Sequence, residues 1–186
     1  MTDDLLGTLR LIVGLLDRAR IPYMLVGSVA ALAHGRSRAT QDFDLVFEAT
    51  VSQLRSFVAT LASDRFYVSE EAALEALRDG TLFNVLDMET GWKVDLIALK
   101  ARPFSEAEFS RRREVTTLGM PLYVASVEDV ILAKLEWAKL GGSERQVEDA
   151  RQLVELHVTG LDRRWIERWV DALGVRQLWE RIAQAR

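Results

Sequence analysis

The stretch LVGSVAALAHGRSRATQDFDLVF, residues 25–47, holds the pattern that decides the fold. Gly27 and Ser28 interrupt an apolar run, and Asp42 and Asp44 flank Phe43 in a segment that otherwise reads as a buried strand. Side chains alternate along a strand, so the two aspartates share one face. Like charges so placed repel each other unless a cation lies between them. The pattern predicts a cation site at this strand; two strand-end aspartates facing solvent are the alternative.

The Gly27-Ser28 pair follows a short strand predicted over 23–26 and opens a brief helix predicted over 28–34. Glycine permits close backbone approach, and a helix N-terminus offers unpaired N–H groups and a positive dipole end to an anion. Ser28 acting only as an N-cap is the alternative. Cationic and hydroxyl side chains follow just before the aspartates, at Arg36, Arg38 and Thr40.

A third aspartate lies in GWKVDLI, residues 91–97. Strand alternation places Lys93, Asp95 and Ile97 on one face, so Asp95 is a charge inside an apolar run. If this strand pairs beside residues 43–47, three carboxylates converge next to the Gly-Ser turn. That arrangement suits a magnesium–nucleoside triphosphate, in which two metal ions clamp the attacking and leaving oxygens.

These features together resemble the nucleotidyltransferase superfamily of the DNA polymerase β type: VGS, thirteen residues, DFD followed by hydrophobic residues, then the aspartate of VDLI. The resemblance covers residues 20–100. It implies an α+β fold with a small mixed β-sheet flanked by helices, two Mg²⁺ ions, and transfer of a nucleoside monophosphate to a hydroxyl.

The resemblance also assigns roles to residues. Gly27 and Ser28 would hold the triphosphate, and Asp42 and Asp44 would bind both metal ions. Asp95 would bind one metal ion and help to deprotonate the acceptor hydroxyl. Nucleotide binding is also expected of an arginine that often precedes the second motif, here Arg38.

The chain is mixed α/β up to about residue 125 and helical after it. This predicts a core over 1–125 and a helical region over 126–186 packed on it, beginning with a capping box at Ser126 and Asp129. The expected helices span 3–20, 51–62, 70–78, 105–113, 127–140, 143–158, 162–173 and 175–185. The expected strands are 43–47, 66–68, a hairpin of TLFNVLDM and WKVDLIAL, and a pair around Gly119 to Val124.

Lys134 lies on an apolar stripe of the helix expected over 127–140. A lysine whose stem is buried and whose head reaches water is one interpretation. The other is an ammonium that reaches the triphosphate or an acidic partner, with Asp149 the nearest candidate. This region resembles abortive-infection-type nucleotidyltransferases, in which a lysine on one helix and an aspartate on the next complete the nucleotide site. Lys134 and Asp149 match that pair, with Glu148 as a rival.

Composition excludes several classes of protein. The 186 residues contain no cysteine, which rules out disulfides and thiolate zinc sites, and carry a net charge of −4, which is unlike a general polyanion binder. No apolar run is long enough to span a bilayer and no secretory signal is evident, so a cytoplasmic location is the default.

Arg111–Arg113 is expected to be a solvated helix face, or alternatively a phosphate contact. Trp165, Trp169 and Leu173 predict a core contact, with a dimer face as the alternative. Neither His34 nor His157 is given a function; each reads as a helix C-terminal residue.

The sequence therefore predicts a Mg²⁺-dependent nucleotidyltransferase that uses a nucleoside triphosphate. The expected acceptor is RNA such as tRNA, or a protein hydroxyl. The resemblance of the C-terminal half to abortive-infection-type nucleotidyltransferases suggests a toxin of an abortive-infection or toxin–antitoxin system, with a cognate antitoxin as partner. Alternatives are an antibiotic nucleotidyltransferase of the aminoglycoside or lincosamide type, and a catalytically silent nucleotide-binding or interaction module.

Overall fold

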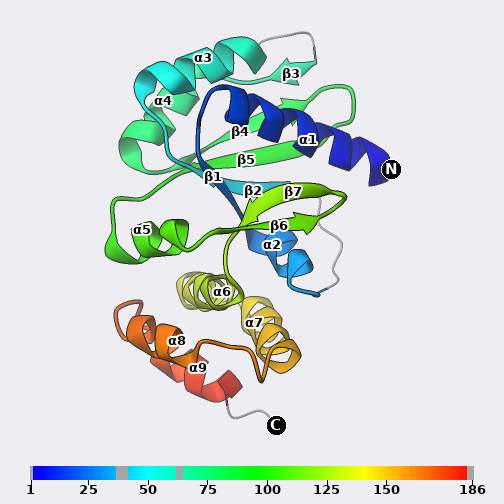
Figure 1. Ribbon diagram of the computed structural model, residues 1–186. Helices are drawn as coiled ribbons and strands as arrows, with labels where there is room; N and C mark the ends of the chain where they lie inside the picture. The colour runs from blue at the N-terminus through cyan, green and yellow to red at the C-terminus, as the bar shows by residue number, and fades with distance from the viewer. Residues whose placement is uncertain (1, 37–41, 62–64, 184–186) are drawn as a thin grey trace.

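The computed structural model describes residues 2–36, 42–61 and 65–183 (Figure 1). Its elements follow one another closely along the chain. In order they are α1 (Thr2–Arg18), β1 (Tyr23–Val26), α2 (Gly27–Ala33), β2 (Asp42–Phe47), α3 (Val51–Leu61), β3 (Phe66–Tyr67), α4 (Glu70–Asp79), β4 (Leu82–Asp87), β5 (Lys93–Ala98), α5 (Pro103–Ser110), β6 (Arg113–Thr117), β7 (Met120–Val124), α6 (Val127–Gly141), α7 (Glu144–Leu156), α8 (Arg163–Val170) and α9 (Arg176–Ala183).

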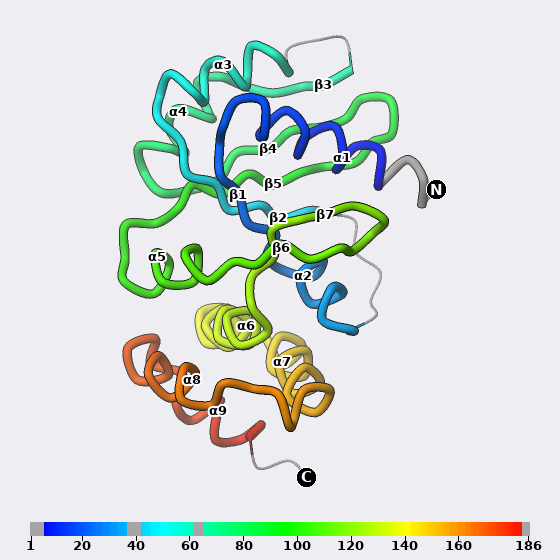
Figure 2. The backbone as a smooth tube through the Cα atoms, viewed as in Figure 1, coloured from blue at the N-terminus to red at the C-terminus, as the bar shows by residue number. Residues whose placement is uncertain are grey.

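The strands form one mixed sheet in the order β3-β4-β5-β2-β1-β7-β6. Two of its neighbouring pairs are parallel, β2 with β5 and β1 with β7, and the others are antiparallel. The expected α+β class, with a mixed sheet flanked by helices and a helical C-terminal part, is confirmed. Figure 2 shows the trace passing from the sheet into α6 to α9, which lie together below it.

The two faces of the central strands differ in character. Phe43, Leu45 and Phe47 of β2 are buried on one face, and the Phe47 ring meets Phe83 of β4 edge-on with centroids 5.8 Å apart. Asp42 and Asp44 alternate with them and point to the opposite face. Helices α3 and α4 lie at one side of the strands and α2, α6 and α7 at the other (Figure 1). The charged face of β2 is thus the one that meets α2.

The β4–β5 hairpin is anchored from the apolar side by Asp87, whose side chain is fully buried. Its Oδ2 accepts hydrogen bonds from Thr8 Oγ1 of α1 at 2.5 Å and from Arg65 at 2.8 Å, and its Oδ1 accepts the Glu89 backbone N–H at 3.1 Å. A buried carboxylate with this many donors is fully satisfied and keeps its charge. The anchor therefore fixes the register that places Asp95 beside β2.

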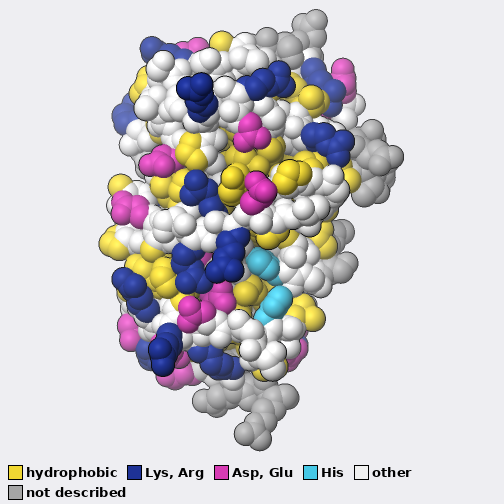
Figure 3. Space-filling model, in the orientation of Figure 1, with side chains coloured by type: hydrophobic (Ala, Val, Ile, Leu, Met, Phe, Trp, Pro, Cys, Tyr) yellow, Lys and Arg dark blue, Asp and Glu magenta, His cyan; other side chains and the backbone are white. Residues whose placement is uncertain are grey.

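The helical part is tied to the core by the two histidines, which form the helix C-caps that the sequence predicts. His34 donates from Nε2 to the carbonyl of Ala125 at 2.8 Å, and His157 donates from Nε2 to the carbonyl of His34 at 2.8 Å. Figure 3 shows the two imidazoles side by side on the surface. Ser126 caps α6 by accepting the Asp129 backbone N–H at 3.2 Å, which confirms the predicted N-cap, and its hydroxyl donates to Asp129 Oδ2 at 2.6 Å.

One predicted helix is wrong at its end. The helix expected over 105–113 stops at Ser110, and Arg113 already belongs to β6. Strand β6, which contains three β-branched residues, pairs with β7. The two strands are joined by the two-residue turn Leu118-Gly119, in which both residues have positive φ. Such a turn matches the twist of a hairpin, and strand pairing outweighs local helix propensity here. None of the helices in the described ranges has the length and apolar character needed to cross a membrane.

Candidate active site

The strand register brings the three aspartates to one edge of one face. Asp44 on β2 is the direct register partner of Asp95 on the parallel strand β5, and Asp42 is the partner of Lys93. In such a pair both side chains stand on the same face of the sheet. The register confirms that the strand of Asp95 pairs beside β2, so that Asp42 and Asp44 lie one pleat repeat apart on one face and Asp95 lies beside Asp44.

The Gly27 turn lies against the Asp44 carboxylate. Gly27 has a φ of +65°, and a Cβ added to it would lie 3.0 Å from Cγ of Asp44 and would overlap its Oδ2. Only glycine fits both the left-handed backbone and the close approach. The N-cap of α2 is Val26, which makes no side-chain cap, so Ser28 stands in the first turn of α2 rather than acting as its N-cap. The first-turn N–H groups thus lie beside the aspartates.

Crowding and burial raise the pKa of Asp44 to about 6. Desolvation is the largest cause, followed by the charges of Asp95 and then Asp42; Lys93 and Lys134 act in the opposite direction. A carboxyl with this pKa releases its proton readily when a cation arrives. Perturbation of this kind, produced by burial together with like charges, is typical of functional sites.

This pKa predicts how stability changes with pH in the metal-free protein. The Asp44 carboxyl titrates near 3.8 when unfolded and near 6 when folded, so its stabilising contribution is complete below the first value and is lost as pH rises through the second. Glu108 also has a raised pKa, about 8, and adds its own pH dependence to the stability. Comparing two proteins that both contain Glu108 removes that contribution. The free energy of unfolding of wild type minus that of Asp44→Asn should fall across this interval in denaturant titrations with EDTA. A difference in unfolding free energy that does not change with pH would contradict the raised pKa of Asp44.

The carboxylates fit magnesium as an open site and not as a closed cage. Over residues 2–36, 42–61 and 65–183, no three acidic or histidine side chains are gathered closely enough to hold a metal ion by themselves. Mg²⁺ prefers oxygen ligands and usually takes one or two protein carboxylates, completing its shell with water and substrate phosphates. The adjacent carboxylates of Asp44 and Asp95 provide such a pair. The residues therefore fit a metal ion that is bound together with a triphosphate.

Lys134 of α6 is buried and contacts Asp149 of α7. Its Nζ lies 3.1 Å from Asp149 Oδ2 and 3.1 Å from Gln146 Oε1. The same aspartate also accepts a hydrogen bond from Arg36, which donates its Nε to Gln152 Oε1 at 3.1 Å. Two largely buried cations thus share one carboxylate, and Lys134 is near enough to Asp44 to lower its pKa. Glu148, the rival partner in the sequence, is instead exposed and bound to Arg151.

Removing the shared carboxylate charge should destabilise the fold strongly. Asp149→Asn leaves the buried Lys134 and Arg36 without their common counter-charge, and breaking a buried pair in this way costs about 3–5 kcal/mol. Denaturant unfolding measures the loss. The matched control is Asp171→Asn, which removes an exposed carboxylate paired with Arg176 and should leave the free energy of unfolding nearly unchanged. Equal losses in the two variants would show that the buried network carries no special energy.

Several polar residues of the site were not singled out from the sequence. Asn84 of β4 is the register partner of Asp95 and donates from Nδ2 to its Oδ1 at 2.6 Å. Lys93, Gln146 and Gln152 also contact site carboxylates or their partners. The sequence contains one indication that Asn84 belongs to the site, namely a polar amide side chain between apolar residues in TLFNVLDM. Arg38, which the resemblance places on the nucleotide, lies outside the described residues.

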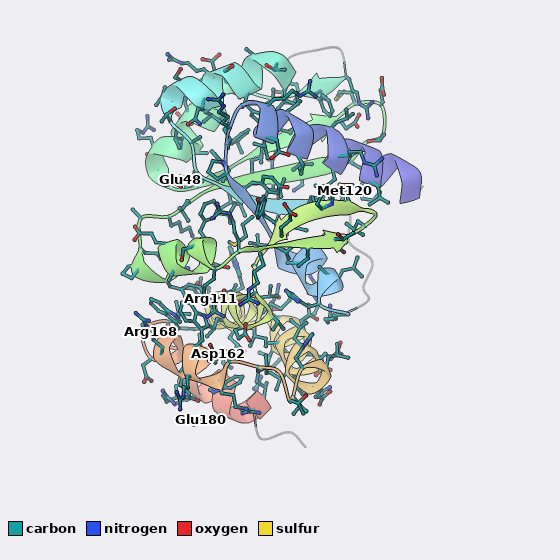
Figure 4. The ribbon with its side chains drawn as sticks, in the orientation of Figure 1. Glu48, Arg111, Met120, Asp162, Arg168 and Glu180 are labelled. Atoms are coloured by element: carbon teal, nitrogen blue, oxygen red, sulfur yellow. The ribbon has the colours of Figure 1, made fainter. Side chains whose placement is uncertain are left out.

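The triple arginine is not a solvated helix face. Arg111 stacks over the Trp165 ring with its guanidinium carbon 3.9 Å from the centroid, and it lies 3.4 Å from a Glu128 oxygen. Arg112 stacks over Phe109 at 4.1 Å and donates to the Phe109 carbonyl at 2.6 Å. Figure 4 shows Arg111 reaching down toward Asp162, at the junction of the sheet with the C-terminal helices. The expected core contact is present, since Trp169 and Leu173 are buried.

The strand order and the C-terminal helices give a fold that is similar to that of solved nucleotidyltransferases. Solved structures agree with it at low sequence identity. The solution structure of the antibiotic-resistance factor ANT(2'')-Ia superimposes with a TM-score of 0.61 at 19% identity, over 95% of each chain. An antigenic nucleotidyltransferase-like protein from Paracoccidioides brasiliensis gives 0.56 at 15% identity, over 98% of this chain and 94% of that one.

A third similar structure is the lincomycin-bound lincosamide antibiotic adenylyltransferase LnuA, with a TM-score of 0.53 at 15% identity over 80% of this chain and 95% of that one. No protein-family model matches the sequence, and no curated protein matches it significantly. The likeness is therefore one of fold, and it rests on structure.

Proposed function

We propose that the protein is a magnesium-dependent nucleotidyltransferase that transfers a nucleoside monophosphate from a triphosphate to a hydroxyl. The observation that carries the proposal is the register pair of Asp44 and Asp95 beside the Gly27 turn. Carboxylates that crowd one another, next to unpaired helix N–H groups, suit a ligand that brings both cations and phosphates. The nucleotidyltransferase fold of the solved structures supports the same reaction.

In this reaction the acceptor oxygen forms a bond to the α-phosphorus, the bond between the α-phosphate and the pyrophosphate breaks, and the hydroxyl proton leaves. The metal ions would supply charge neutralisation at the phosphates and at the attacking oxygen. Asp42, Asp44 and Asp95 would hold these ions, and Asp95 would also accept the proton of the acceptor hydroxyl. Gly27 and Ser28 bind the triphosphate through backbone N–H groups.

Lys134 binds the triphosphate from the opposite side, and Asp149 positions it. The support is that the ammonium is buried, is already within electrostatic reach of Asp44, and has a fixed orientation. Arg36 joins the pair as a second cation on the same carboxylate. Preorganised charges of this kind stabilise developing negative charge without reorganising during the reaction.

A small hydroxyl compound is a better acceptor candidate than RNA. RNA binding needs basic side chains that are free to contact phosphates, whereas Arg111 and Arg112 are stacked on aromatic rings and the chain has a net charge of −4. Two of the similar structures, a complex of ANT(2'')-Ia with adenylyl-2''-tobramycin and lincomycin-bound LnuA, hold small antibiotic molecules. Aminoglycosides and lincosamides are therefore the first acceptors to test.

The test is a transfer assay with Mg²⁺ and each α-labelled triphosphate, with an aminoglycoside, a lincosamide, total RNA or no acceptor. Pyrophosphate release with label on the drug supports the proposal and its acceptor class, and label on RNA identifies RNA as the acceptor instead. Triphosphate binding with no transfer would leave a silent nucleotide-binding module. Absence of both binding and transfer would overturn the proposal.

A toxin of an abortive-infection or toxin–antitoxin system is a second candidate. The Lys134–Asp149 contact favours it, because that pairing carries the sequence resemblance to abortive-infection-type enzymes. Induced expression that arrests growth, and that does so no longer when Asp44 is replaced by Asn, would support it. Unimpaired growth with active enzyme present would exclude it.

A further inference from the structure

Lys93 supplies a cation to the aspartate cluster from within the chain. Its Nζ lies 3.1 Å from both carboxylate oxygens of Asp95, two residues further along the same strand. Across the sheet Lys93 is the register partner of Asp42, and its charge lowers the pKa of Asp44. One ammonium thus contacts Asp95 and lies within electrostatic reach of Asp42 and Asp44, the three carboxylates that the proposed function assigns to metal ions.

Both oxygens of Asp95 already have a donor in this arrangement. Asn84 Nδ2 donates to Oδ1 at 2.6 Å from the neighbouring strand, while Lys93 lies against both oxygens. A divalent ion that approaches Asp95 is repelled by the ammonium at the same two oxygens, so its binding is weakened for as long as the ammonium stays there. The lysine is free to move, since its side chain is 40% exposed and its stem is flexible.

We propose that Lys93 competes with divalent cations for Asp95, so that the chain binds metal weakly alone and tightly only with a nucleoside triphosphate. The phosphates bring the negative charge that accepts the displaced ammonium, which makes metal and nucleotide binding mutually dependent. This inference rests on the proposed function, because it takes Asp95 as a metal ligand. Lys93 is then a positioning residue that sets the order in which the site is filled.

The experiment measures Mn²⁺ binding to the full chain by electron paramagnetic resonance, with and without a non-hydrolysable triphosphate analogue. Lys93→Met should tighten Mn²⁺ binding about tenfold or more without the nucleotide, because it removes a unit charge from the ligand carboxylate. With the nucleotide present, the difference from wild type should shrink to about threefold or less, since the phosphates have already taken up the ammonium. The nucleotide therefore enhances metal binding less in the variant.

Two further variants separate charge from shape. Lys93→Arg keeps the charge and should retain the weak, nucleotide-dependent Mn²⁺ binding of wild type. Lys100→Met removes an exposed lysine beyond the opposite end of β5 and should leave Mn²⁺ binding unchanged. Thermal unfolding is a second readout: in EDTA at low salt, Lys93→Met should melt lower than wild type, and it should gain more from Mn²⁺. Lys93→Gln replaces Lys93→Met if the latter does not fold.

The outcomes of these experiments distinguish a failure of this inference from a failure of the proposed function on which it rests. If wild type binds Mn²⁺ with the nucleotide but Lys93→Met binds it no more tightly without the nucleotide, the competition is wrong and the proposed function stands. If Lys100→Met tightens binding equally, the effect is one of net charge, and the inference is overturned. If wild type binds no Mn²⁺ even with the nucleotide, both fail.

Discussion

Asp44→Asn should abolish nucleotidyl transfer while leaving the protein folded. The substitution removes one of the two adjacent carboxylates that a metal ion would bind, and loss of several kcal/mol of transition-state stabilisation lowers the rate by on the order of a hundred- to a thousandfold. In the metal-free protein it also removes a partly buried charge that Asp95 and Asp42 repel. Its melting temperature in EDTA near pH 8 should therefore equal or exceed that of wild type.

The matched control for this variant is Glu48→Gln. Glu48 is an exposed acid immediately beyond the far end of β2, well away from α2 (Figure 4), and making it neutral should change neither the transfer rate nor the melting temperature. Transfer is followed by pyrophosphate release and stability by thermal unfolding. An Asp44→Asn protein that unfolds would mean that the aspartates are structural. One that keeps its activity would mean that the metal is bound elsewhere.

Strand alternation and spacing were sufficient to predict the sheet face on which the three aspartates meet. Placing Asp95 required only that the strand in WKVDLI pair beside DFDLVF, and the register aligns Asp44 with Asp95. The C-terminal pair Lys134 and Asp149 could be predicted as neighbours because both occupy helices joined by a short Gly-Gly turn. The alternation of polar and apolar residues predicts which side chains share a face, and short connections predict which elements are neighbours.

The parts that sequence did not predict depend on contacts between distant segments. Arg36 reaches Asp149 across more than a hundred residues, and the Arg111 guanidinium finds the Trp165 ring on α8. A run of three arginines gives no local sign that two of them stack on aromatic rings. Strand alternation places Lys93 on the face of Asp95, but only the register shows that it also lies beside Asp42. Tertiary pairing overrides local preference at such positions.

Gly27→Ala should be the most damaging single change of the turn. A left-handed φ costs a non-glycine residue about 1–2 kcal/mol, and the added methyl would also overlap the Asp44 carboxylate. Overpacking against the Asp44 side chain, which must shift to make room, adds about 1–3 kcal/mol. The expected total is therefore about 2–5 kcal/mol of lost unfolding free energy, together with a displaced Asp44 and loss of transfer activity.

The two causes can be separated by repeating the substitution in an Asp44→Ala background. Without the carboxylate the overlap with Oδ2 and Cγ is removed and only the Cβ of residue 44, 3.3 Å away, remains, so Gly27→Ala should then cost little more than the backbone share, about 1–2 kcal/mol. Gly14→Ala is the matched control, because Gly14 lies within α1, has nothing within 4 Å of an added Cβ and has no positive φ; it should stabilise by about 0.5–1 kcal/mol. Equal costs of Gly27→Ala in both backgrounds would show that the turn needs glycine for its φ alone. A smaller cost in the Asp44→Ala background would show that the turn and the carboxylate are built against each other, since no side chain at residue 27 leaves Asp44 where it is.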